Sequence, residues 1–227
     1  MEFASFFNSL GVEVTVIEML DEILGGMDKE LSAMLRAEYA KRGIKFMLNT
    51  KVVSLDGSTG ENGETQVRVN YENAEGTGFS VAEKLLMSVG RRPVTKGFGL
   101  ENLNPEKTER GNIRVDGQMR TSVTGVYACG DLTGFSLLAH TAVREAEVAV
   151  HAVLGKKDCM SYRAIPGVVY TNPEIAGVGD TEEALQKKGI PYRTVKLPMA
   201  YSGRFVAENE GVNGCLLYTS PSPRDQR

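Results

Sequence analysis

The segment GVYACGDLTG, residues 125–134, places a carboxylate where it could do chemistry. Residues 126–128 are mostly apolar, which predicts a short buried strand. Gly130 removes the Cβ where this strand ends, and Asp131 follows at its carboxyl end. Open α/β sheets bind ligands at the carboxyl ends of their strands, so Asp131 is a candidate binding residue. A Gly-Asp pair is also a frequent turn signal, and a solvated turn residue is the competing interpretation.

A second acid ends the run VEVTVIE, residues 12–18, which predicts a strand with Glu18 at its end. An apolar stripe at helical spacing precedes this run, and Gly11 ends the predicted helix. The stripe consists of Phe3, Phe6, Phe7 and Leu10. A helix followed by a strand that ends in an acid is the second half of a β-α-β dinucleotide-binding unit, whose acid binds the ribose. The glycine turn that opens such a unit is not in the sequence, so we expect the chain to have been cut from a longer one; a native N-terminal helix is the alternative.

The elements that must position these acids follow a regular order. Asp28 can cap a helix that ends at Gly43, and a strand is predicted at residues 44–48. Helices therefore alternate with strands, which predicts an α/β fold with a parallel, Rossmann-type sheet. Three shorter strands follow and predict an antiparallel flap on that sheet. They are expected at residues 52–55, at residues 66–71 and near Phe79, with turns that include residues 56–57 and 62–63.

The second half of the chain continues the alternation. A buried strand is predicted at residues 84–89, where it stops at Gly90, and short strands at residues 112–116 and 126–128. A long helix is predicted at residues 137–154, with a small-residue face made of Ala142, Ala146, Val150 and Val153. After a polar linker at residues 156–161 come a strand at 167–170, a helix at 181–188 capped by Thr181, and a strand at 192–197.

Composition excludes several classes of protein. The 227 residues are 41% hydrophobic and 24% charged, as in ordinary globular proteins. A net charge of −3 with interspersed signs predicts neither nucleic acid nor membrane as a partner. The three cysteines have no metal-ligand or disulfide-framework spacing, so we expect no metal and a cytoplasmic protein. Cys129 is predicted to be a small buried apolar residue.

The C-terminal stretch CLLYTSPSPRD, residues 215–225, breaks from the preceding pattern into a Ser/Pro run. It resembles the translated adapter of a sequencing library. We therefore expect residues 215–227 to be an artefact and leave them out of the fold prediction.

Five spaced segments together resemble the flavoprotein disulfide reductases, which are the class I pyridine nucleotide-disulfide oxidoreductases. They are VTVIE, VGRRP, TSVTGVYACGD, LLAHTA and VVYTNPEIAGVG, in this order, and the resemblance covers residues 1–214. The sequence is most similar to the members that oxidise dihydrolipoamide, with mercuric reductase and soluble transhydrogenase as alternatives. The resemblance implies an NAD-binding domain at residues 1–89, a second segment of the FAD-binding domain at 90–160, and the start of an α+β dimerisation domain at 161–214.

The resemblance implies two cofactors, FAD and NAD. On the FAD side, Asp131 accepts a hydrogen bond from the ribityl chain, and Gly130 lets the cofactor approach the backbone. Leu138, Ala139 and His140 open the helix under the flavin ring, where free backbone N–H groups can stabilise charge on the reduced ring.

On the NAD side, the resemblance assigns three residues. Glu18 binds the adenosine ribose, which favours NAD over NADP. Glu2 sits beside the nicotinamide, with a solvated first-turn acid as the alternative, and Gly90 passes close to the dinucleotide, next to the cation of Arg91.

The family's catalytic groups are a redox-active cysteine pair and a His-Glu base, and the resemblance places none of them in this sequence. His140 is therefore not expected to be catalytic. His151 is expected at a surface or interface, since spacing assigns it no carboxylate partner. The implied enzyme oxidises dihydrolipoamide through a redox disulfide and FAD, and reduces NAD to NADH. It is a homodimer that serves the lipoyl domain of a 2-oxoacid dehydrogenase complex and takes part in cell redox homeostasis. The 227-residue chain itself is expected to be inactive, and a truncated, non-catalytic nucleotide-binding module is the alternative.

Overall fold

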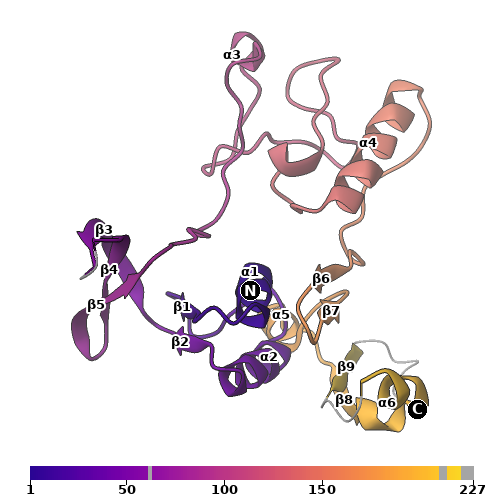
Figure 1. Ribbon diagram of the computed structural model, residues 1–227. Helices are drawn as coiled ribbons and strands as arrows, with labels where there is room; N and C mark the ends of the chain where they lie inside the picture. Colours follow the sequence, from indigo (N-terminus) through magenta and orange to yellow (C-terminus); the bar gives the residue numbers. More distant parts are fainter. Residues whose placement is uncertain (61–62, 210–213, 221–227) are drawn as a thin grey trace. The chain divides into compact units, whose positions relative to one another are not determined.

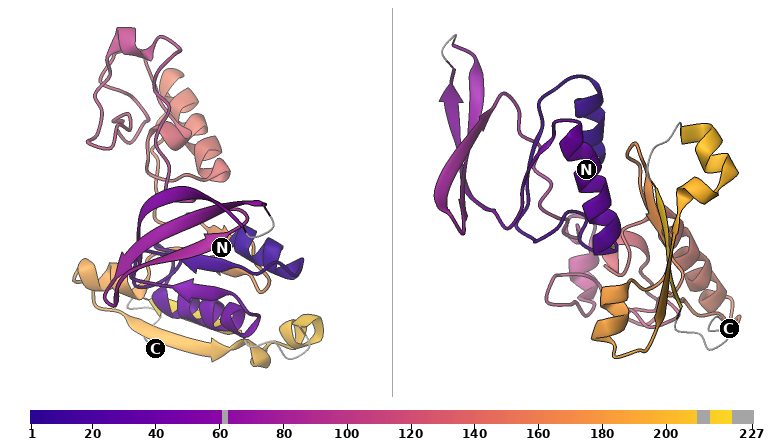
Figure 2. Two further views of the ribbon diagram at one scale, coloured as in Figure 1. Left: turned by 60° about the vertical axis from the view of Figure 1, so that its left-hand side comes forward. Right: turned by 90° about the horizontal axis from the view of Figure 1, so that it is seen from below.

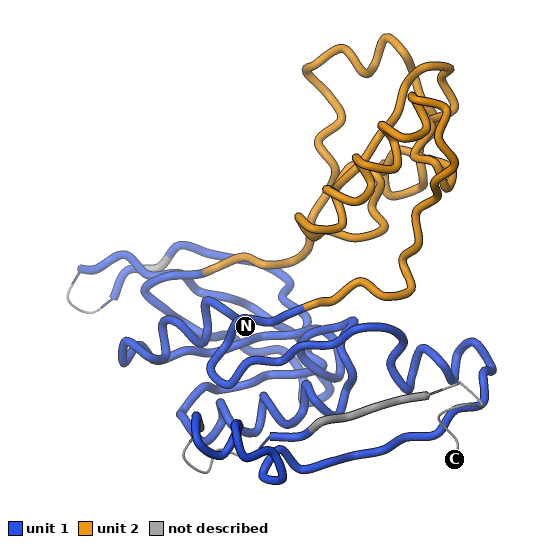
Figure 3. Tube along the Cα trace, turned by 90° about the vertical axis from the view of Figure 1, so that its right-hand side faces the viewer, with its two compact units in different colours: residues 1–85, 168–227 blue, residues 86–167 orange. Residues whose placement is uncertain are grey.

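The computed structural model describes residues 1–60, 63–209 and 214–220. The chain folds into two compact units (Figure 3). The first unit combines residues 1–85 with residues 168–227, and the second consists of residues 86–167. The first unit therefore joins the N-terminal nucleotide-binding pattern to the C-terminal part of the chain.

The first unit begins with the predicted alternation of helix and strand (Figure 1). Its first elements are α1 (Glu2–Ser9), β1 (Thr15–Ile17), α2 (Lys29–Lys41) and β2 (Lys45–Met47). Strands β1 and β2 pair in parallel, with Thr15 opposite Lys45. This confirms the predicted α/β class, because a parallel pair needs a crossover connection, and α2 supplies it.

Helix α2 shows why this sequence folds locally as it does. The Asp28 side chain accepts a hydrogen bond from the backbone N–H of Glu30 at 3.0 Å, as predicted for the cap. Beyond the last turn, Gly43 adopts a φ of 92°, which favours glycine. Leu35 and Tyr39 of α2 are buried in the core of the unit. The core contains Ile23, Leu35, Tyr39, Ile44 and Ile175.

Helix α1 packs in an unexpected direction. Ala4 contacts the core, whereas the apolar stripe seen in the sequence is exposed. Its members Phe3, Phe6, Phe7 and Leu10 each expose at least 41% of their surface. The side of the helix that carries Ala4, rather than its aromatic side, therefore faces the core of the unit.

The predicted antiparallel flap is present as one three-stranded sheet (Figure 2). It consists of β3 (Lys51–Thr59), β4 (Thr65–Asn73) and β5 (Gly76–Ala82), in that order. The predicted turn at residues 56–57 is wrong, because Asp56 and Gly57 pair with β4 inside the longer strand β3. Of the other predicted turn, Asn62 lies outside the described residues. At the β4–β5 turn, the Asn73 side chain accepts a hydrogen bond from the N–H of Glu75 at 2.9 Å.

The C-terminal part of the first unit confirms three predicted elements. They are β6 (Gly167–Val169), α5 (Glu182–Lys187) and β8 (Arg193–Pro198). The Thr181 side chain caps α5 by accepting a hydrogen bond from the N–H of Ala184 at 3.2 Å. The part also contains β7 (Ile175–Gly177), η2 (Met199–Tyr201), α6 (Gly203–Asn209) and β9 (Cys215–Ser220). Strand β9, which starts the segment expected to be an adapter, pairs antiparallel with β8, and residues 221–227 lie outside the described residues.

The second unit contains α3 (Leu100–Leu103), η1 (Gly130–Leu132) and α4 (Ala139–Val153). The predicted strands at residues 112–116 and 126–128 are wrong: only the isolated bridges from Lys107 to Ile113 and from Arg120 to Tyr127 form there. A turn held by Asp116 interrupts the pairing, since its carboxylate accepts hydrogen bonds from the N–H groups of residues 118 and 120. The residues at 126–128 are half-buried rather than buried.

Two further predictions for the second unit fail. Residues 84–89 are exposed and form no strand, because no described strand pairs with them. The buried face of helix α4 is not the predicted small-residue face, because it is shifted toward the preceding residues in the sequence. Val150 and Val153 of the predicted face are exposed. The buried residues are Thr141, Glu145, Val148 and Ala152. In the part of the chain that the structure describes, no helix is both long and apolar enough to cross a membrane.

Candidate functional site

The Gly-Asp turn and helix α4 form the candidate site of the second unit. Gly130 opens the short helix η1 with a φ of 71°. A Cβ at this position would lie 3.3 Å from the Cβ of Ala142 on α4, so both backbone and space favour glycine. Asp131 follows at an exposed position, and its carboxylate has no hydrogen-bond partner among the described residues. The turn therefore leaves an acceptor open to a ligand.

Helix α4 contacts η1 and begins next to it. Leu138 is the extended N-cap residue, and no side chain in the described chain caps this end. Ala139 and His140 are exposed in the first turn, where backbone N–H groups have no partner within the helix. These groups and the positive end of the helix dipole favour negative charge. The helix that residues 138–140 open thus contacts the Gly-Asp turn, through Ala142 and Glu145 at Gly130.

Cys129 differs from the prediction. It is exposed rather than buried, because the chain before the turn does not enter a sheet. Desolvation of the thiol by the neighbouring protein atoms, together with the nearby Glu145 carboxylate, raises the pKa of Cys129. A thiol with a raised pKa is a weak nucleophile at neutral pH, so this cysteine is unsuited to covalent chemistry.

Glu18 stands directly after β1, where the sequence places it. Its backbone continues the contact with the β2 region, since its N–H donates to the carbonyl of Met47 at 2.9 Å. One carboxylate oxygen accepts a hydrogen bond from the N–H of Leu20 at 2.9 Å. The half-buried acid is therefore oriented at the carboxyl end of a parallel strand, where such sheets bind nucleotides.

Glu2 begins α1 and has a structural partner that sequence reasoning missed. Its carboxylate accepts a hydrogen bond from the backbone N–H of Tyr170 at 3.0 Å, next to β6. The acid thus fastens the start of α1 to a segment 168 residues away. Gly90, the third predicted NAD residue, has a φ of 107° and lies with Arg91 in the exposed chain of the second unit.

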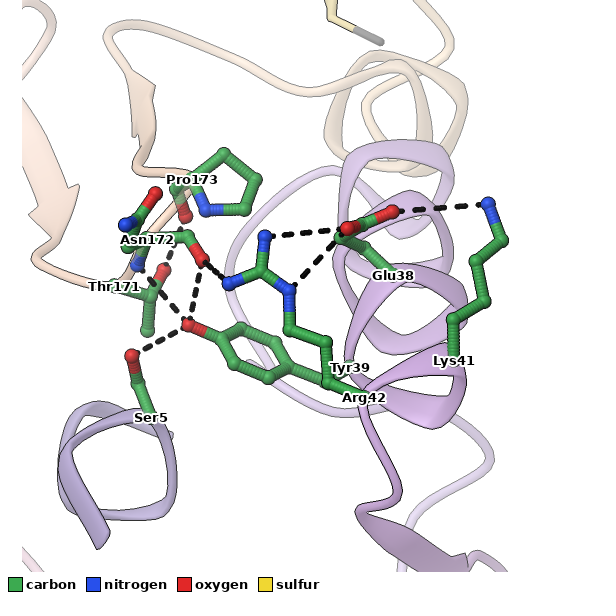
Figure 4. Close-up of polar contacts among 8 residues, drawn as sticks. All are labelled: Ser5, Glu38, Tyr39, Lys41, Arg42, Thr171, Asn172 and Pro173. Atoms are coloured by element: carbon green, nitrogen blue, oxygen red, sulfur yellow. Dashed lines mark hydrogen bonds and ion pairs between the residues drawn. The ribbon is translucent and has the colours of Figure 1, made fainter. Parts of the chain in front are cut away.

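A buried tyrosine extends this junction between α1, α2 and the loop after β6 (Figure 4). The Tyr39 hydroxyl lies 2.5 Å from the Ser5 hydroxyl, and it accepts a hydrogen bond from the N–H of Asn172 at 3.0 Å. Arg42 donates to the carbonyl of Asn172 at 2.6 Å and is held by Glu38 one turn earlier. The loop is thus fixed to both helices, and Tyr39 itself is only 1% exposed.

His151 has a carboxylate partner that its spacing in the sequence could not assign. Its Nδ1 lies 2.7 Å from Asp158 in the linker that follows α4. Arg144 also grips Asp158, through two hydrogen bonds of 2.9 and 2.6 Å. These bonds from Arg144 and His151 hold the pKa of the Asp158 carboxyl far below its usual range. The cluster ties the linker to α4.

The chain has close relatives among known proteins. The family described as "Pyridine nucleotide-disulphide oxidoreductase" matches residues 1–146, and the dimerisation domain of the same name matches residues 165–217. Dihydrolipoyl dehydrogenase 1 of Arabidopsis thaliana mitochondria is 40% identical over 206 residues, which cover 90% of this chain and 40% of the plant protein. Dihydrolipoyl dehydrogenase of Thermus scotoductus is 41% identical over 206 residues, covering 90% of this chain and 43% of that protein. The chain thus spans about two fifths of the length of these relatives.

Solved structures show the same fold. The Cu(II) complex of the HOCl-induced flavoprotein disulfide reductase RclA from Escherichia coli matches with a TM-score of 0.83 and 28% identity, covering 99% of this chain and 50% of that one. LpdA from Mycobacterium tuberculosis matches with a TM-score of 0.78 and 27% identity, covering 96% and 49%. The parallel pair, the flap, the part of an FAD domain and the start of a dimerisation domain are those of this family, whose cofactors are FAD and NAD. The chain belongs to the pyridine nucleotide-disulphide oxidoreductases.

Proposed function

We propose that this chain is part of a flavoenzyme that oxidises dihydrolipoamide and reduces NAD to NADH. The observation that carries the proposal is the open carboxylate of Asp131 beside the uncapped start of α4. The relatives named dihydrolipoyl dehydrogenase favour this substrate over the mercuric ion or transhydrogenase chemistry of the alternatives. FAD, when bound, supplies a carrier that passes two electrons from the dithiol to NAD.

The residues present fit a flavin nucleotide. The Asp131 carboxylate can accept a hydrogen bond from a sugar-chain hydroxyl, since no described side chain or backbone group occupies it. Gly130, the residue before Asp131, is buried, and a Cβ there would lie 3.3 Å from the Cβ of Ala142. The N–H groups of Ala139 and His140 can hold negative charge on the ring without any proton transfer by the protein. Leu138, as the extended N-cap, supplies an apolar surface beside them.

The NAD side follows the same reasoning. Glu18 keeps one carboxylate oxygen for the Leu20 N–H and can offer the other to a ribose hydroxyl. Its negative charge would repel the 2′-phosphate of NADP, which is why we propose NAD as the acceptor. Glu2 supplies an acid near the nicotinamide, anchored by Tyr170, and Gly90 gives the backbone a close approach to the dinucleotide.

We also propose the domain plan implied by the sequence, with NAD-binding residues 1–89, FAD-binding residues 90–160, a dimerisation segment at 161–214 and an adapter from residue 215. The match of the dimerisation domain to residues 165–217 supports a homodimer. A lipoyl domain of a 2-oxoacid dehydrogenase complex is the proposed partner, and the cytoplasm the proposed location. The redox cysteine pair and the His-Glu base are expected on parts of the enzyme outside this chain.

An FAD titration tests the proposed flavin site of the second unit. The ¹⁵N-labelled chain should bind FAD weakly, with shifts of the amide signals of Asp131, Ala139 and His140, and Asp131→Ala should weaken binding by about tenfold, as expected for a lost hydrogen bond to a charged group. Asp116→Glu, which keeps a carboxylate in a turn elsewhere in the second unit, is the control and should bind like the wild type. Binding that Asp131→Ala leaves unchanged would refute the assignment.

The proposed reaction is tested by sequencing the native gene and assaying its product. Sequencing of the native locus should reveal a C-x-x-x-x-C pair upstream and a His-Glu pair downstream of these residues. The product of that reading frame should form NADH from dihydrolipoamide, whereas the 227-residue chain should not. Reduction of mercuric ion, or transhydrogenation without dithiol oxidation, would establish an alternative instead. A native start codon with its own ribosome site before Met1 would favour the non-catalytic module.

A further inference from the structure

Glu145 is a fully buried acid in the middle of α4, with 0% of its surface exposed. One carboxylate oxygen accepts a hydrogen bond from the backbone N–H of Gly130 at 2.5 Å. The other accepts a hydrogen bond from the Tyr162 hydroxyl at 2.6 Å. Thr133 lies 3.4 Å from the same oxygen and donates a shorter bond of 2.9 Å to the carbonyl of Gly130. The acid thus joins α4, the Gly-Asp turn and the segment that contains Tyr162.

Burial at this position is energetically unfavourable for a carboxylate. A buried charge costs free energy unless hydrogen bonds replace its water, and an apolar side chain would suit the buried face of a helix better. The neighbouring cation, Arg144, points its guanidinium at Asp158 instead. The two short bonds from Gly130 and Tyr162 are therefore what keeps the acid in place. Burial and this hydrogen bond raise the pKa of Tyr162 well above its ordinary range, so the hydroxyl keeps its proton and remains a donor.

The bond to Gly130 acts directly on the candidate flavin site. Gly130 has the left-handed conformation that turns the chain, and the next residue is Asp131. Fixing the N–H of Gly130 fixes the Cys129–Gly130 peptide, and Thr133 fixes the next peptide, which leads to Asp131, through the Gly130 carbonyl. Phe135, which follows the turn, stacks on the Tyr162 ring with 4.8 Å between the ring centroids.

We propose that Glu145 is a positioning residue of the flavin site: it holds the Gly130 peptide so that the Asp131 carboxylate faces the ribityl chain, and Tyr162 holds Glu145. The inference rests on the proposed function for its ligand. The turn itself requires only the contacts among Gly130, Glu145 and Tyr162, which can be measured without cofactor.

The test compares variants of the ¹⁵N-labelled 227-residue chain. Glu145→Ala removes the acceptor. Glu145→Gln keeps one oxygen that can accept from the Gly130 N–H, and its NH₂ group can donate a hydrogen bond to the Tyr162 hydroxyl. Glu147→Ala is the matched control, since this exposed acid lies on the same helix and contacts only Arg144 among the described residues. The first readout is the amide proton shift and exchange rate of Gly130. The second is the dissociation constant for FAD, followed through the Asp131 amide.

We expect the Gly130 proton to lose its downfield shift and its protection in Glu145→Ala, and the dissociation constant to rise by about tenfold, the effect of one lost charge-assisted bond. Glu145→Gln and Glu147→Ala should stay within about twofold of the wild type. A purely structural role would lower stability without this pattern, so a folded Glu145→Ala chain that binds FAD like the wild type overturns the proposal.

Tyr162→Phe keeps the test decisive if Glu145→Ala fails to fold. Removing only this hydroxyl should loosen Glu145 and raise the dissociation constant by about threefold, with a partial change of the Gly130 signal. Unchanged FAD binding together with an unchanged Gly130 signal in this variant overturns the proposal. A wild-type chain that protects Gly130 but gives no FAD-dependent shifts refutes the proposed function, and with it the flavin role of Glu145.

Discussion

At the scale of single residues, Asp158 is the shared partner of a basic residue and a histidine on α4. This carboxylate accepts two hydrogen bonds from Arg144 and lies against His151. The contacts favour the ionised acid, and they lower the pKa of Asp158 below its ordinary value while raising that of the Arg144 guanidinium. Because the folded-state pKa is the lower one, this cluster contributes stability above the pKa of the unfolded acid and loses it as the pH falls.

Asp158→Asn should therefore destabilise the chain at neutral pH, since the neutral amide cannot pair with Arg144 and His151. The difference from the wild type should shrink as the pH falls below about 4, where the unfolded wild-type carboxyl takes up its proton. Urea unfolding at pH 7 and pH 3 measures this. Glu101→Gln on α3, an exposed acid, is the control and should show no such trend. A difference that grows toward low pH would contradict the cluster as described.

The sequence predicts those residues whose role follows from their place after a strand or at a helix start. Glu18 and Asp131 are of this kind, and the structure leaves both with a carboxylate oxygen able to bind a ligand. Glu145 and Tyr162 escaped prediction because their partnership depends on three segments meeting in space. The available signal was an acid at the helical spacing of the buried positions, four residues after Thr141 and three before Val148.

At the scale of elements, Tyr39 joins α1, α2 and the loop at residues 171–173. Tyr39→Phe keeps the buried ring and removes only the hydroxyl. We expect a loss of about 1–2 kcal/mol in the free energy of unfolding, the usual net value of one or two hydrogen bonds. Urea denaturation measures it. Tyr170→Phe is the control, because Tyr170 is 70% exposed, and it should change stability by less than about 0.5 kcal/mol. Equal effects of the two variants would count against the junction.

Local signals account for the elements that were predicted well. Asp28 and Gly43 bracket α2, Thr181 caps α5, and the alternation of polar and apolar residues predicts the flap. The strands predicted at residues 84–89, 112–116 and 126–128 fail for one shared reason. A strand forms only beside a partner strand, and a sequence pattern describes the strand itself but not the segment that would pair with it.

At the scale of the whole molecule, the first of the two connections between the compact units has no regular structure. No helix or strand forms from residue 83 to residue 99, and Lys84 and Arg91 are exposed there. Within residues 1–209, brief trypsin digestion should cut first after Lys84 or Arg91. Mass spectrometry identifies the cut. Arg144 is the internal control, because its guanidinium binds Asp158 and the residue lies within helix α4. First cleavage within α2 or α4 would contradict this organisation.

The partition into units was not predictable from the pattern of the sequence. Ile175 lies in the core with Leu35 and Ile44, although some 130 residues separate them from it in the chain. Sequence periodicity reports which face of an element is apolar, but not which distant element covers it. The attachment of the β6–β7 segment to helices α1 and α2 is therefore a finding of the structure alone.

The exposed apolar run from Leu85 to Val89 favours association between molecules in solution. Its leucines, methionine and valine expose between 42% and 86% of their surfaces, and no proline interrupts them. Short, uncharged runs of this composition pair readily between molecules. Concentrated solutions should turn turbid through cross-β association seeded at this run, and replacing Met87 with lysine should keep them clear.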